Sequence, residues 1–379
     1  MTIIGEELVF SNDADPRVGE VIETKRERVS DEYGRTFTRV NVLVGDESDV
    51  HPDEKNRLRQ LGDHFEEELE RHPEWQATEI VKVGEYANGL PVNEIKIDPN
   101  NEAAIGLYKE RKDDGSLVGT QMEQWALDFP TAIALEPLQR LRQGGRLLPG
   151  GHVDERTLHL FTYMIDAIGI RARARIYADR VTEIASQLNR DLEVMSIGCG
   201  AAVPNIEATL KTRQEVGKSI HWNFFDFDKR ALGFAEELFA EAGIHAQQGM
   251  LDFGPLTKDN QYWKYEGRNM ARAFKEPSES VDIVDALGLW EYLPEETAIK
   301  FMERAYDKVR PGGSVIVSNM LESRPQKLYN QKAVGWPDLE IRSEKDLLDI
   351  AQMANVDPNQ VTFTHSEDGV YVVMEVCKP

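Results

Sequence analysis

The sequence is poor in the residues that mark several classes of protein. Of its 379 residues, only Cys199 and Cys377 are cysteines. Two cysteines so far apart do not indicate a disulfide framework, and without paired histidines they give no zinc signature. We therefore expect no metal site, and the low cysteine content fits the reducing cytoplasm.

A targeting segment and a long apolar run are also lacking. The first ten residues, MTIIGEELVF, are acidic and contain neither a basic n-region nor an apolar h-region, so no signal peptide is predicted. No apolar run approaches the roughly 18 residues that span a bilayer. The expectation is a cytoplasmic protein that does not contact membranes.

Positive charge is scarce as well. Lysine and arginine together number 44 against 67 acidic residues, which gives a formal net charge of −23. Nonspecific binding to nucleic acid depends on neutralising phosphates, so no nucleic-acid partner is expected. The one basic cluster fits a solvated helix face or structural ion pairs better than an anion site, and it comprises Arg171, Arg173, Arg175 and Arg180.

The sequence does contain enough apolar residues, 41%, to build a core, and enough length for two structural units. The clearest linker is the glycine- and proline-rich stretch 144–151. It divides the chain into an α+β accessory region, residues 1–150, and residues 151–379, a long helix followed by a second domain. The accessory region is expected to cover a site or to join two copies into a homodimer.

The accessory region has a mixed pattern. A helix is predicted over 52–72, where Leu58, Leu61, Phe65 and Leu69 recur at helical spacing. A second helix is expected over 121–143, broken or kinked at its two prolines. Short strands are expected at 37–44, 79–83, 93–97, 104–109 and 116–119, the last in a hairpin after an Asp-Asp-Gly turn.

After the linker, strands and helices alternate. A long helix is predicted over 154–189 with a kink near Gly169. The expected strands lie at 194–197, 220–225, 245–248, 281–287, 313–319, 361–365 and 370–377. The helices between them are expected at 205–215, 229–242, 295–309 and 344–354. Such alternation is typical of a Rossmann-like, doubly wound α/β fold with helices on both faces of a parallel sheet.

A glycine turn follows the first of these strands, in Ser196-Ile197-Gly198-Cys199-Gly200. In a doubly wound sheet this turn lies at the carboxyl end of the strand, where ligands bind, and glycine lets the backbone approach a ligand closely. The dinucleotide fingerprint fails because Val203 stands at its third glycine, and no lysine of a phosphate-binding loop follows. A tight strand–helix turn without a ligand is the alternative.

Acidic residues follow the next two strands. Asp226, beside Phe227, is placed to accept hydrogen bonds from ribose hydroxyls, whereas Asp228 is expected to cap the next helix. A plain turn acid is the alternative for Asp226. After the third strand, Leu251 and Asp252 could flank an adenine ring and accept from its amino group, a weak signal on its own.

The fourth motif decides the resemblance. It runs from Ser280 to Pro294 as SVDIVDALGLWEYLP, and KVRPGGSVIVSN follows at 308–319. The ordered motifs resemble those of class I S-adenosylmethionine-dependent methyltransferases over about 191–378. The resemblance implies a seven-stranded sheet whose last strand is antiparallel, and S-adenosylmethionine as the cofactor.

The resemblance also implies the surroundings of the cofactor. Ala286 and Leu287 would border it, whereas Trp290, Tyr292 and Asn319 would lie on the substrate side; core packing is the alternative for the two aromatic residues. The family usually has an acid where this chain has Ser196, and a third glycine where it has Ala202. These departures concern contacts to the methionine end of the cofactor and leave the backbone turn in place.

A looser similarity points to bacterial methyltransferases that esterify the carboxyl group of 3-hydroxy fatty acids. It rests on the runs SIGCGAA, DFD-x-x-AL and ALGLWEYLP, and on Trp336, Leu339 and Arg342. Trp336 thereby joins the expected substrate residues.

The expected function is methyl transfer to a small-molecule acceptor, with no catalytic residue assigned. No histidine lies near 287–292 or Asn319, and a carboxylate is already ionised at neutral pH, which favours a carboxyl acceptor. The alternatives are an amine or hydroxyl methyltransferase of a natural-product pathway, another transfer reaction on the same cofactor, and a non-catalytic cofactor-binding protein.

Overall fold

The computed structural model describes residues 2–9, 19–45, 52–85, 91–127, 132–139, 155–226, 228–244, 251–252, 273–336 and 339–379. The chain divides into two compact units. Unit 1 comprises Met1–Asp46, Arg171–Glu322 and Glu340–Pro379, and unit 2 comprises Glu47–Ile170 and Ser323–Leu339. This division differs from the boundary expected at residue 150, because the N-terminal strands belong with the C-terminal sheet. The expected linker lies outside the described residues.

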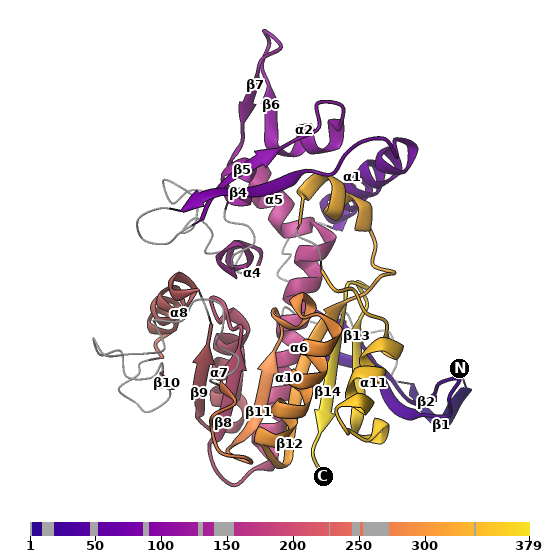
Figure 1. Cartoon of the computed structure of the whole chain (residues 1–379), viewed down its shortest axis with the longest axis vertical. Helices are drawn as coiled ribbons and strands as arrows, with labels where there is room; N and C mark the ends of the chain where they lie inside the picture. Colours follow the sequence, from indigo (N-terminus) through magenta and orange to yellow (C-terminus); the bar gives the residue numbers. More distant parts are fainter. Residues whose placement is uncertain are drawn as a thin grey trace. The chain divides into compact units, whose positions relative to one another are not determined.

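Unit 1 is built on one ten-stranded sheet (Figure 1). Its order is β10-β9-β8-β11-β12-β14-β13-β3-β2-β1. The strands are β1 (Thr2–Val9), β2 (Val21–Ser30), β3 (Thr36–Val44), β8 (Leu192–Ile197), β9 (Ile220–Phe225), β10 (Leu251–Asp252), β11 (Val281–Ala286), β12 (Val309–Met320), β13 (Val361–Ser366) and β14 (Tyr371–Cys377). Neighbours from β10 to β12 are parallel, and β14 is antiparallel to β12 and β13. The expected Rossmann-like α/β fold with an antiparallel closing strand is confirmed.

Three N-terminal strands extend the sheet beyond the seven expected. β3 pairs in parallel with β13, Thr38 opposite Thr362, and β2 and β1 add antiparallel strands outside it. β3 was expected from the sequence, whereas β2 was not. In β2 the charges of VIETKRERVS mask the alternation that leaves Glu27 and Val29 buried.

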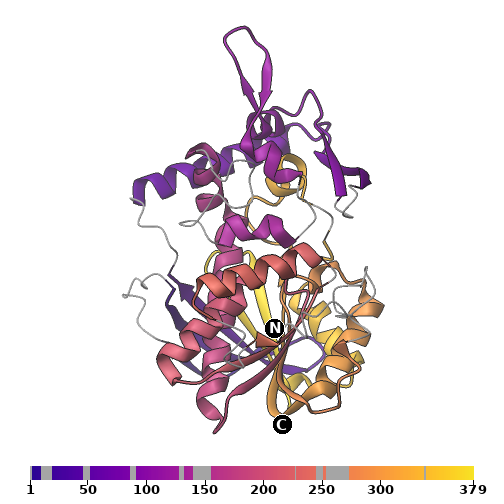
Figure 2. The ribbon, with the colours of Figure 1, turned by 90° about the vertical axis from the view of Figure 1, so that its left-hand side faces the viewer.

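Alternate residues of the central strands face two different helix layers, as the period of two requires. Val194 and Ile283 pack in one cluster with α6 (Ile165–Gln187), α7 (Val203–Val216) and α8 (Lys229–Glu241). Their neighbours Met195 and Val284 pack in a second cluster with α10 (Glu295–Lys308) and α11 (Glu344–Met353). Figure 2 shows these two sets of helices on opposite sides of the strands. The central strands are therefore buried on both faces.

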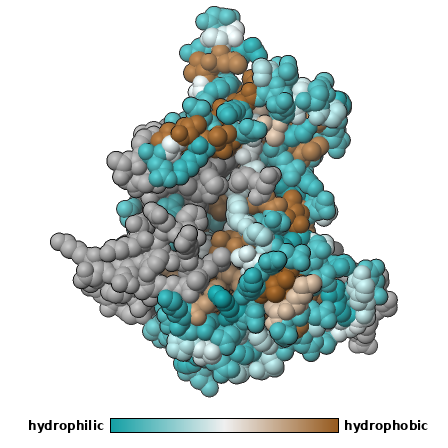
Figure 3. All heavy atoms as spheres, in the orientation of Figure 1, coloured by the Kyte–Doolittle hydropathy of each residue, from teal (hydrophilic) through white to brown (hydrophobic). Residues whose placement is uncertain are grey.

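Unit 2 consists of short elements. They are α1 (Pro52–Arg71), β4 (Glu79–Glu85), β5 (Pro91–Lys96), α2 (Glu102–Tyr108), β6 (Lys109–Arg111), β7 (Leu117–Gly119), α3 (Gln121–Ala126), η1 (Ala132–Leu135), α4 (Glu136–Gln139), α5 (Glu155–Tyr163), the first residues of α6, and the π-helix η6 (Tyr329–Val334). The helix expected over 52–72, the strands at 79–83 and 93–97 and the β6–β7 hairpin are confirmed. Figure 3 shows an apolar band on this hairpin below a hydrophilic tip. Leu117 and Val118 of β7 are exposed.

Two expectations for this unit are wrong. Residues 104–109 form most of helix α2, because the Asn101 side chain caps its N-terminus and accepts from Ala104 N at 3.0 Å, and the alanine and leucine residues that follow favour helix. The long helix expected over 154–189 is two helices, α5 and α6, which separate at Met164 and not at Gly169.

The described residues include neither a candidate membrane span nor a candidate metal cluster. Among them no helix combines the length and the apolar character that crossing a bilayer requires. In that same part of the chain, no group of three or more histidine, cysteine, aspartate or glutamate residues is placed to hold a metal ion.

Candidate functional site

The glycine turn follows β8 and is hydrogen-bonded to the carboxyl end of β9. Gly198 has φ +69°, and its N–H donates to the carbonyl oxygen of Phe225 at 2.7 Å. A β-carbon at this position would lie 2.5 Å from Cβ of Leu289, in the segment after β11. Gly200 also has a positive φ, +57°. The turn is thus held close to two other strand ends, and at Gly198 only glycine fits without rearrangement.

Asp226 binds this turn from the end of β9. One carboxylate oxygen accepts from Gly200 N and the other from Asp228 N, each at 2.8 Å. Helix α7 then begins at Val203, after Ala202 with φ +54°. The sequence predicts that Asp226 accepts hydrogen bonds from ribose hydroxyls. In the structure its carboxylate binds two backbone amides and so fixes the shape of the turn.

A buried acid lies beneath the turn. Asp285 on β11 is directly opposite Ser196 on β8, whose hydroxyl donates to Asp285 Oδ1 at 2.7 Å. Tyr177 of α6 donates to Asp285 Oδ2 at 2.6 Å. Asn205 Nδ2 of α7 donates to the Ser196 hydroxyl at 3.3 Å and to the Tyr177 hydroxyl at 3.4 Å. All four residues are buried, so β8, β11, α6 and α7 meet in one polar network.

Burial governs the ionisation of these groups. Burial raises the pKa of Asp285 to about 7. The hydrogen bonds from Tyr177, Ser196 and Asn205 act in the opposite direction and lower this pKa. The pKa of the Cys199 thiol in the turn is raised well above its usual value by burial and by the negative charges of Asp226 and Asp285. The Cys199 thiol is therefore protonated at neutral pH and is no nucleophile.

The two residues expected to border a cofactor lie at the carboxyl end of β11. Ala286 and Leu287 are both buried, in the second and the first apolar cluster respectively. The carbonyl oxygen of Leu287 accepts from the Ser318 hydroxyl at 2.7 Å and from Arg173 Nη1 at 3.4 Å. The backbone after β11 is thereby tied to β12 and to α6.

The basic cluster of the sequence forms structural ion pairs. Arg180 binds Glu375 at 2.7 Å, and Arg175 pairs with Glu207. Buried Arg173 lies 3.9 Å from Glu291 and 4.6 Å from the centre of the Tyr371 ring. These contacts favour the structural interpretation of the cluster over an anion site.

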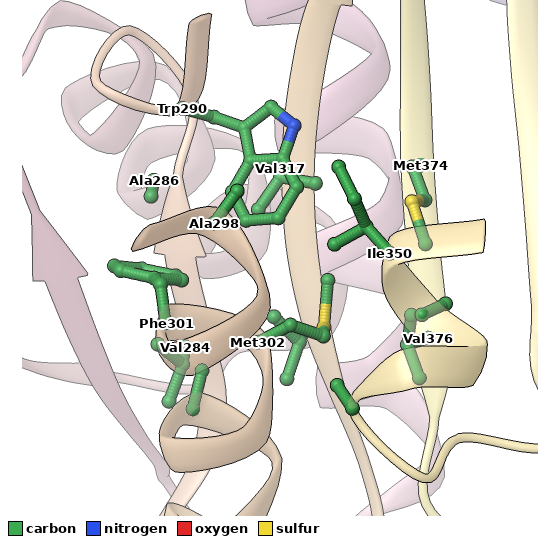
Figure 4. Packing of buried hydrophobic residues seen from close by; sticks show 14 of the residues in the cluster. Val284, Ala286, Trp290, Ala298, Phe301, Met302, Val317, Ile350, Met374 and Val376 are labelled. Carbon is green, nitrogen blue, oxygen red and sulfur yellow. The ribbon is translucent and has the colours of Figure 1, made fainter. Parts of the chain in front are cut away.

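The structure places two expected substrate residues in the interior. Trp290 is fully buried and meets Phe301 edge to face at 5.8 Å, within the cluster shown in Figure 4. Asn319 is also fully buried, and its amide donates to the carbonyl oxygens of Met320 and Glu340 at 3.0 and 3.1 Å. This placement favours packing over acceptor contact for both residues. Tyr292, in contrast, is 37% exposed.

Four other expected residues lie in another unit or are described only in part or not at all. Trp336 belongs to unit 2, where its ring lies 6.4 Å from that of Trp125. Leu251 and Asp252 form β10 itself, opposite Trp222 and Asn223 in the middle of β9, and the strand expected before them at 245–248 lies outside the described residues. Phe227 lies outside the described residues.

The structure therefore gathers Ser196, Gly198, Cys199, Gly200 and Asp226 at one sheet edge, with Leu287 on the adjoining strand. Sequence reasoning missed Tyr177, Asn205 and the carboxyl group of Asp285 as parts of this site. The signal for Asp285 was available in the sequence. An acid within an apolar strand that is buried on both faces is rare, and burial is costly unless the acid is hydrogen-bonded or paired.

Comparisons with known proteins agree on the fold. No family model matches the chain, and no curated protein matches its sequence. A solved structure called a "possible exported protein", from Bordetella parapertussis, is 15% identical with a TM-score of 0.50 over 69% of this chain and 84% of that one. At this identity the likeness shows the shared fold alone.

Two looser matches are methyltransferases. The S-adenosylmethionine-dependent methyltransferase SibL in its apo form is 18% identical, with a TM-score of 0.42 over 74% of this chain and 83% of that one. Magnesium protoporphyrin IX methyltransferase from Synechocystis PCC 6803, with bound cofactor, is 15% identical, with a TM-score of 0.37 over 56% and 83%. Superpositions this loose support no activity or acceptor for the present chain.

Proposed function

We propose that this protein is an S-adenosylmethionine-dependent methyltransferase of a small molecule, and that the methylated group is a carboxylate. The observation that carries the proposal is the glycine turn at the carboxyl edge of the sheet. Its backbone is held by Asp226 on one side and lies against Leu289 on the other. Such an edge, at the ends of β8, β9 and β11, is where doubly wound folds bind nucleoside ligands.

The residues present fit that cofactor. Gly198 and Gly200 have no side chains, which suits close approach of the methionine portion to the backbone of the turn. Each Asp226 carboxylate oxygen accepts one backbone amide, and an acid at the end of the second strand is placed to accept from ribose hydroxyls. Leu287 offers an apolar side chain at the adjoining strand end. The network around Asp285 ties the ends of β8 and β11 to each other and to α6 and α7.

When bound, the cofactor supplies an electrophilic methyl group, and the protein contributes alignment and exclusion of water. The turn and Asp226 would orient the nucleoside. Ser318 and Arg173 hold the Leu287 carbonyl and with it the segment after β11. A carboxylate acceptor would already be ionised at neutral pH and would have no proton to lose, so no general base would be required.

The histidines support a carboxylate over a phenol or alcohol. Unit 1 has two histidines among its described residues. His221 stands at the amino end of β9, near Asp191 and Glu193, at the opposite edge of the sheet. His365 of β13 is bound to Glu344 at 2.8 Å, and β14 and β12 separate it from β11. Neither is placed to take a proton from an acceptor at the site.

Calorimetry and a product assay test the proposal. We expect S-adenosylhomocysteine to bind the purified protein, and S-adenosylmethionine with a 3-hydroxy fatty acid to yield a methyl ester detectable by mass spectrometry. Phenol and amine panels run in parallel identify the methylated atom. If neither S-adenosylmethionine nor S-adenosylhomocysteine bound, the proposed cofactor would be wrong. Binding without transfer to any acceptor would support the non-catalytic alternative, for which Ser196 and Ala202 are the motivating departures.

Asp226→Asn is expected to weaken S-adenosylhomocysteine binding by about 10- to 100-fold, because an amide nitrogen would face a backbone donor and one acceptor for the ribose would be lost. Titration calorimetry measures the change. The matched control is Asp191→Asn, since Asp191 Oδ1 also accepts a backbone amide, from Ser219 at 2.9 Å, but just before β8 at the other edge. Equal affinities for the two variants would contradict the assigned role.

A further inference from the structure

We propose that Asp285 is a positioning residue of the cofactor site, whose buried carboxylate provides the negative charge opposite the α-ammonium group of the cofactor. This inference rests on the proposed function. It assigns to β11 the acid that is missing from β8 at Ser196.

The placement of the carboxyl group supports this assignment. Asp285 and Ser196 are paired residues of adjacent parallel strands, each close to the carboxyl end of its strand. Moving an acid from one to the other leaves it beneath the same turn. The shared hydrogen bond of 2.7 Å shows that the two side chains point to the same side of the sheet. The network of four residues then holds the carboxyl group in place through Tyr177 of α6 and Asn205 of α7.

Among the described residues that face Asp285, no side chain brings a balancing positive charge. Ser196, Tyr177 and Asn205 are neutral donors, and the paired residue on β12 is apolar Ile316. Cys199 in the turn is held as a neutral thiol.

The charged groups on neighbouring elements have other contacts. Arg173, one turn before Tyr177, directs its guanidinium to the carbonyl of Leu287 and lies near Glu291. Asp226, across the turn, adds further negative charge. A buried carboxylate without a cation is costly, so a structural role alone would be served as well by a neutral side chain.

A ligand that brings positive charge removes this cost. The ammonium and sulfonium groups of S-adenosylmethionine, or the ammonium of S-adenosylhomocysteine, would favour the ionised form of Asp285. Without ligand, burial keeps the pKa near 7. Binding at neutral pH should therefore release a proton from Asp285, and affinity should fall as pH drops below 7 because the acid must first ionise.

The test is titration calorimetry of the full chain with S-adenosylhomocysteine between pH 6 and pH 8. For the wild-type protein we expect binding about tenfold weaker at pH 6 than at pH 8, from a single group of pKa near 7. Asp285→Asn should bind about tenfold more weakly than wild type at pH 8 and equally at pH 6. A purely structural role for Asp285 would weaken binding at both pH values alike.

Two further measurements keep the inference testable should Asp285→Asn fail to fold. Titrations of the wild-type protein at pH 7 in phosphate and in Tris should reveal release of about half a proton per ligand bound. Tyr177→Phe removes a hydrogen bond that lowers the Asp285 pKa, so it should move the midpoint of the affinity profile to higher pH.

The double variant Ser196→Asp/Asp285→Ser returns the acid to β8 and is expected to bind within about threefold of wild type at pH 8, since additivity fails for residues in contact. Ligand binding with no proton release, or a pH profile unchanged in Asp285→Asn, would overturn the inference and leave the proposed function intact. Absence of nucleoside binding in wild type at every pH would overturn both.

Discussion

Replacing Gly198 with alanine is expected to reduce S-adenosylhomocysteine binding more than 100-fold, below detection by calorimetry, by analogy with the large effects of misplacing a bound reactant by about 1 Å. The new β-carbon would lie 2.5 Å from Cβ of Leu289, and the positive φ adds backbone strain. The glycine turn and the segment after β11 would have to separate. Both border the proposed cofactor position, so the displacement would fall on the site itself.

Gly217→Ala is the matched control for this variant. Gly217 ends α7 with φ +70°, almost the same as Gly198, but an added β-carbon there meets no atom within 4 Å. It should cost about 1 kcal/mol of unfolding free energy and leave nucleoside affinity unchanged. If Gly198→Ala bound the nucleoside as tightly as Gly217→Ala, close packing of the turn would have no part in binding.

Gly313→Ala is expected to lower the free energy of unfolding by about 3 kcal/mol, at the upper end of the cost of overpacking. Its β-carbon would lie 2.2 Å from the carbonyl oxygen of Asp282 on β11 and 2.8 Å from Cγ1 of Val309. Backbone cannot move aside as a flexible side chain can, so the pairing of β11 and β12 would be disturbed. Urea denaturation followed by circular dichroism measures the loss.

The neighbouring glycine offers the control. Gly312 has φ +82°, and a β-carbon there meets nothing within 4 Å. Gly312→Ala should therefore cost only the strain of its backbone, about 1 kcal/mol. A Gly313→Ala protein as stable as Gly312→Ala would show that β11 and β12 approach each other less closely at this point.

The C-terminal part of the sheet was predictable because its signals are local. β8, β9, β11 and β14 are apolar runs, and a strand buried on both faces leaves that mark in the sequence whatever it pairs with. β2 left no such mark. Its charged side chains are accommodated at the outer part of the sheet, and its pairing with β3 depends on tertiary structure.

The site was predictable to a similar degree. The backbone features, Gly198, Gly200 and the acid at Asp226, follow from local sequence and lie together in the structure. The side chains that complete it come from residues far apart in the chain. Tyr177 and Asp285 are 108 residues apart, and only the pairing of α6 with the sheet brings them into contact. Trp290 shows the converse, since its position in the motif suggested the acceptor while its indole lies in the core.

The pairing of β3 with β13 has a consequence for synthesis on the ribosome. Residues Thr36–Val44 leave the ribosome early, yet their parallel partner, Val361–Ser366, is made more than 300 residues later. Until then one edge of the β2–β3 hairpin is open to pairing with other chains. Arg28 and Arg39 on these two strands disfavour such pairing through their charge. We therefore expect unit 1 to be completed only after β13 has been made, and the nascent chain to depend until then on chaperones that shield exposed strand edges.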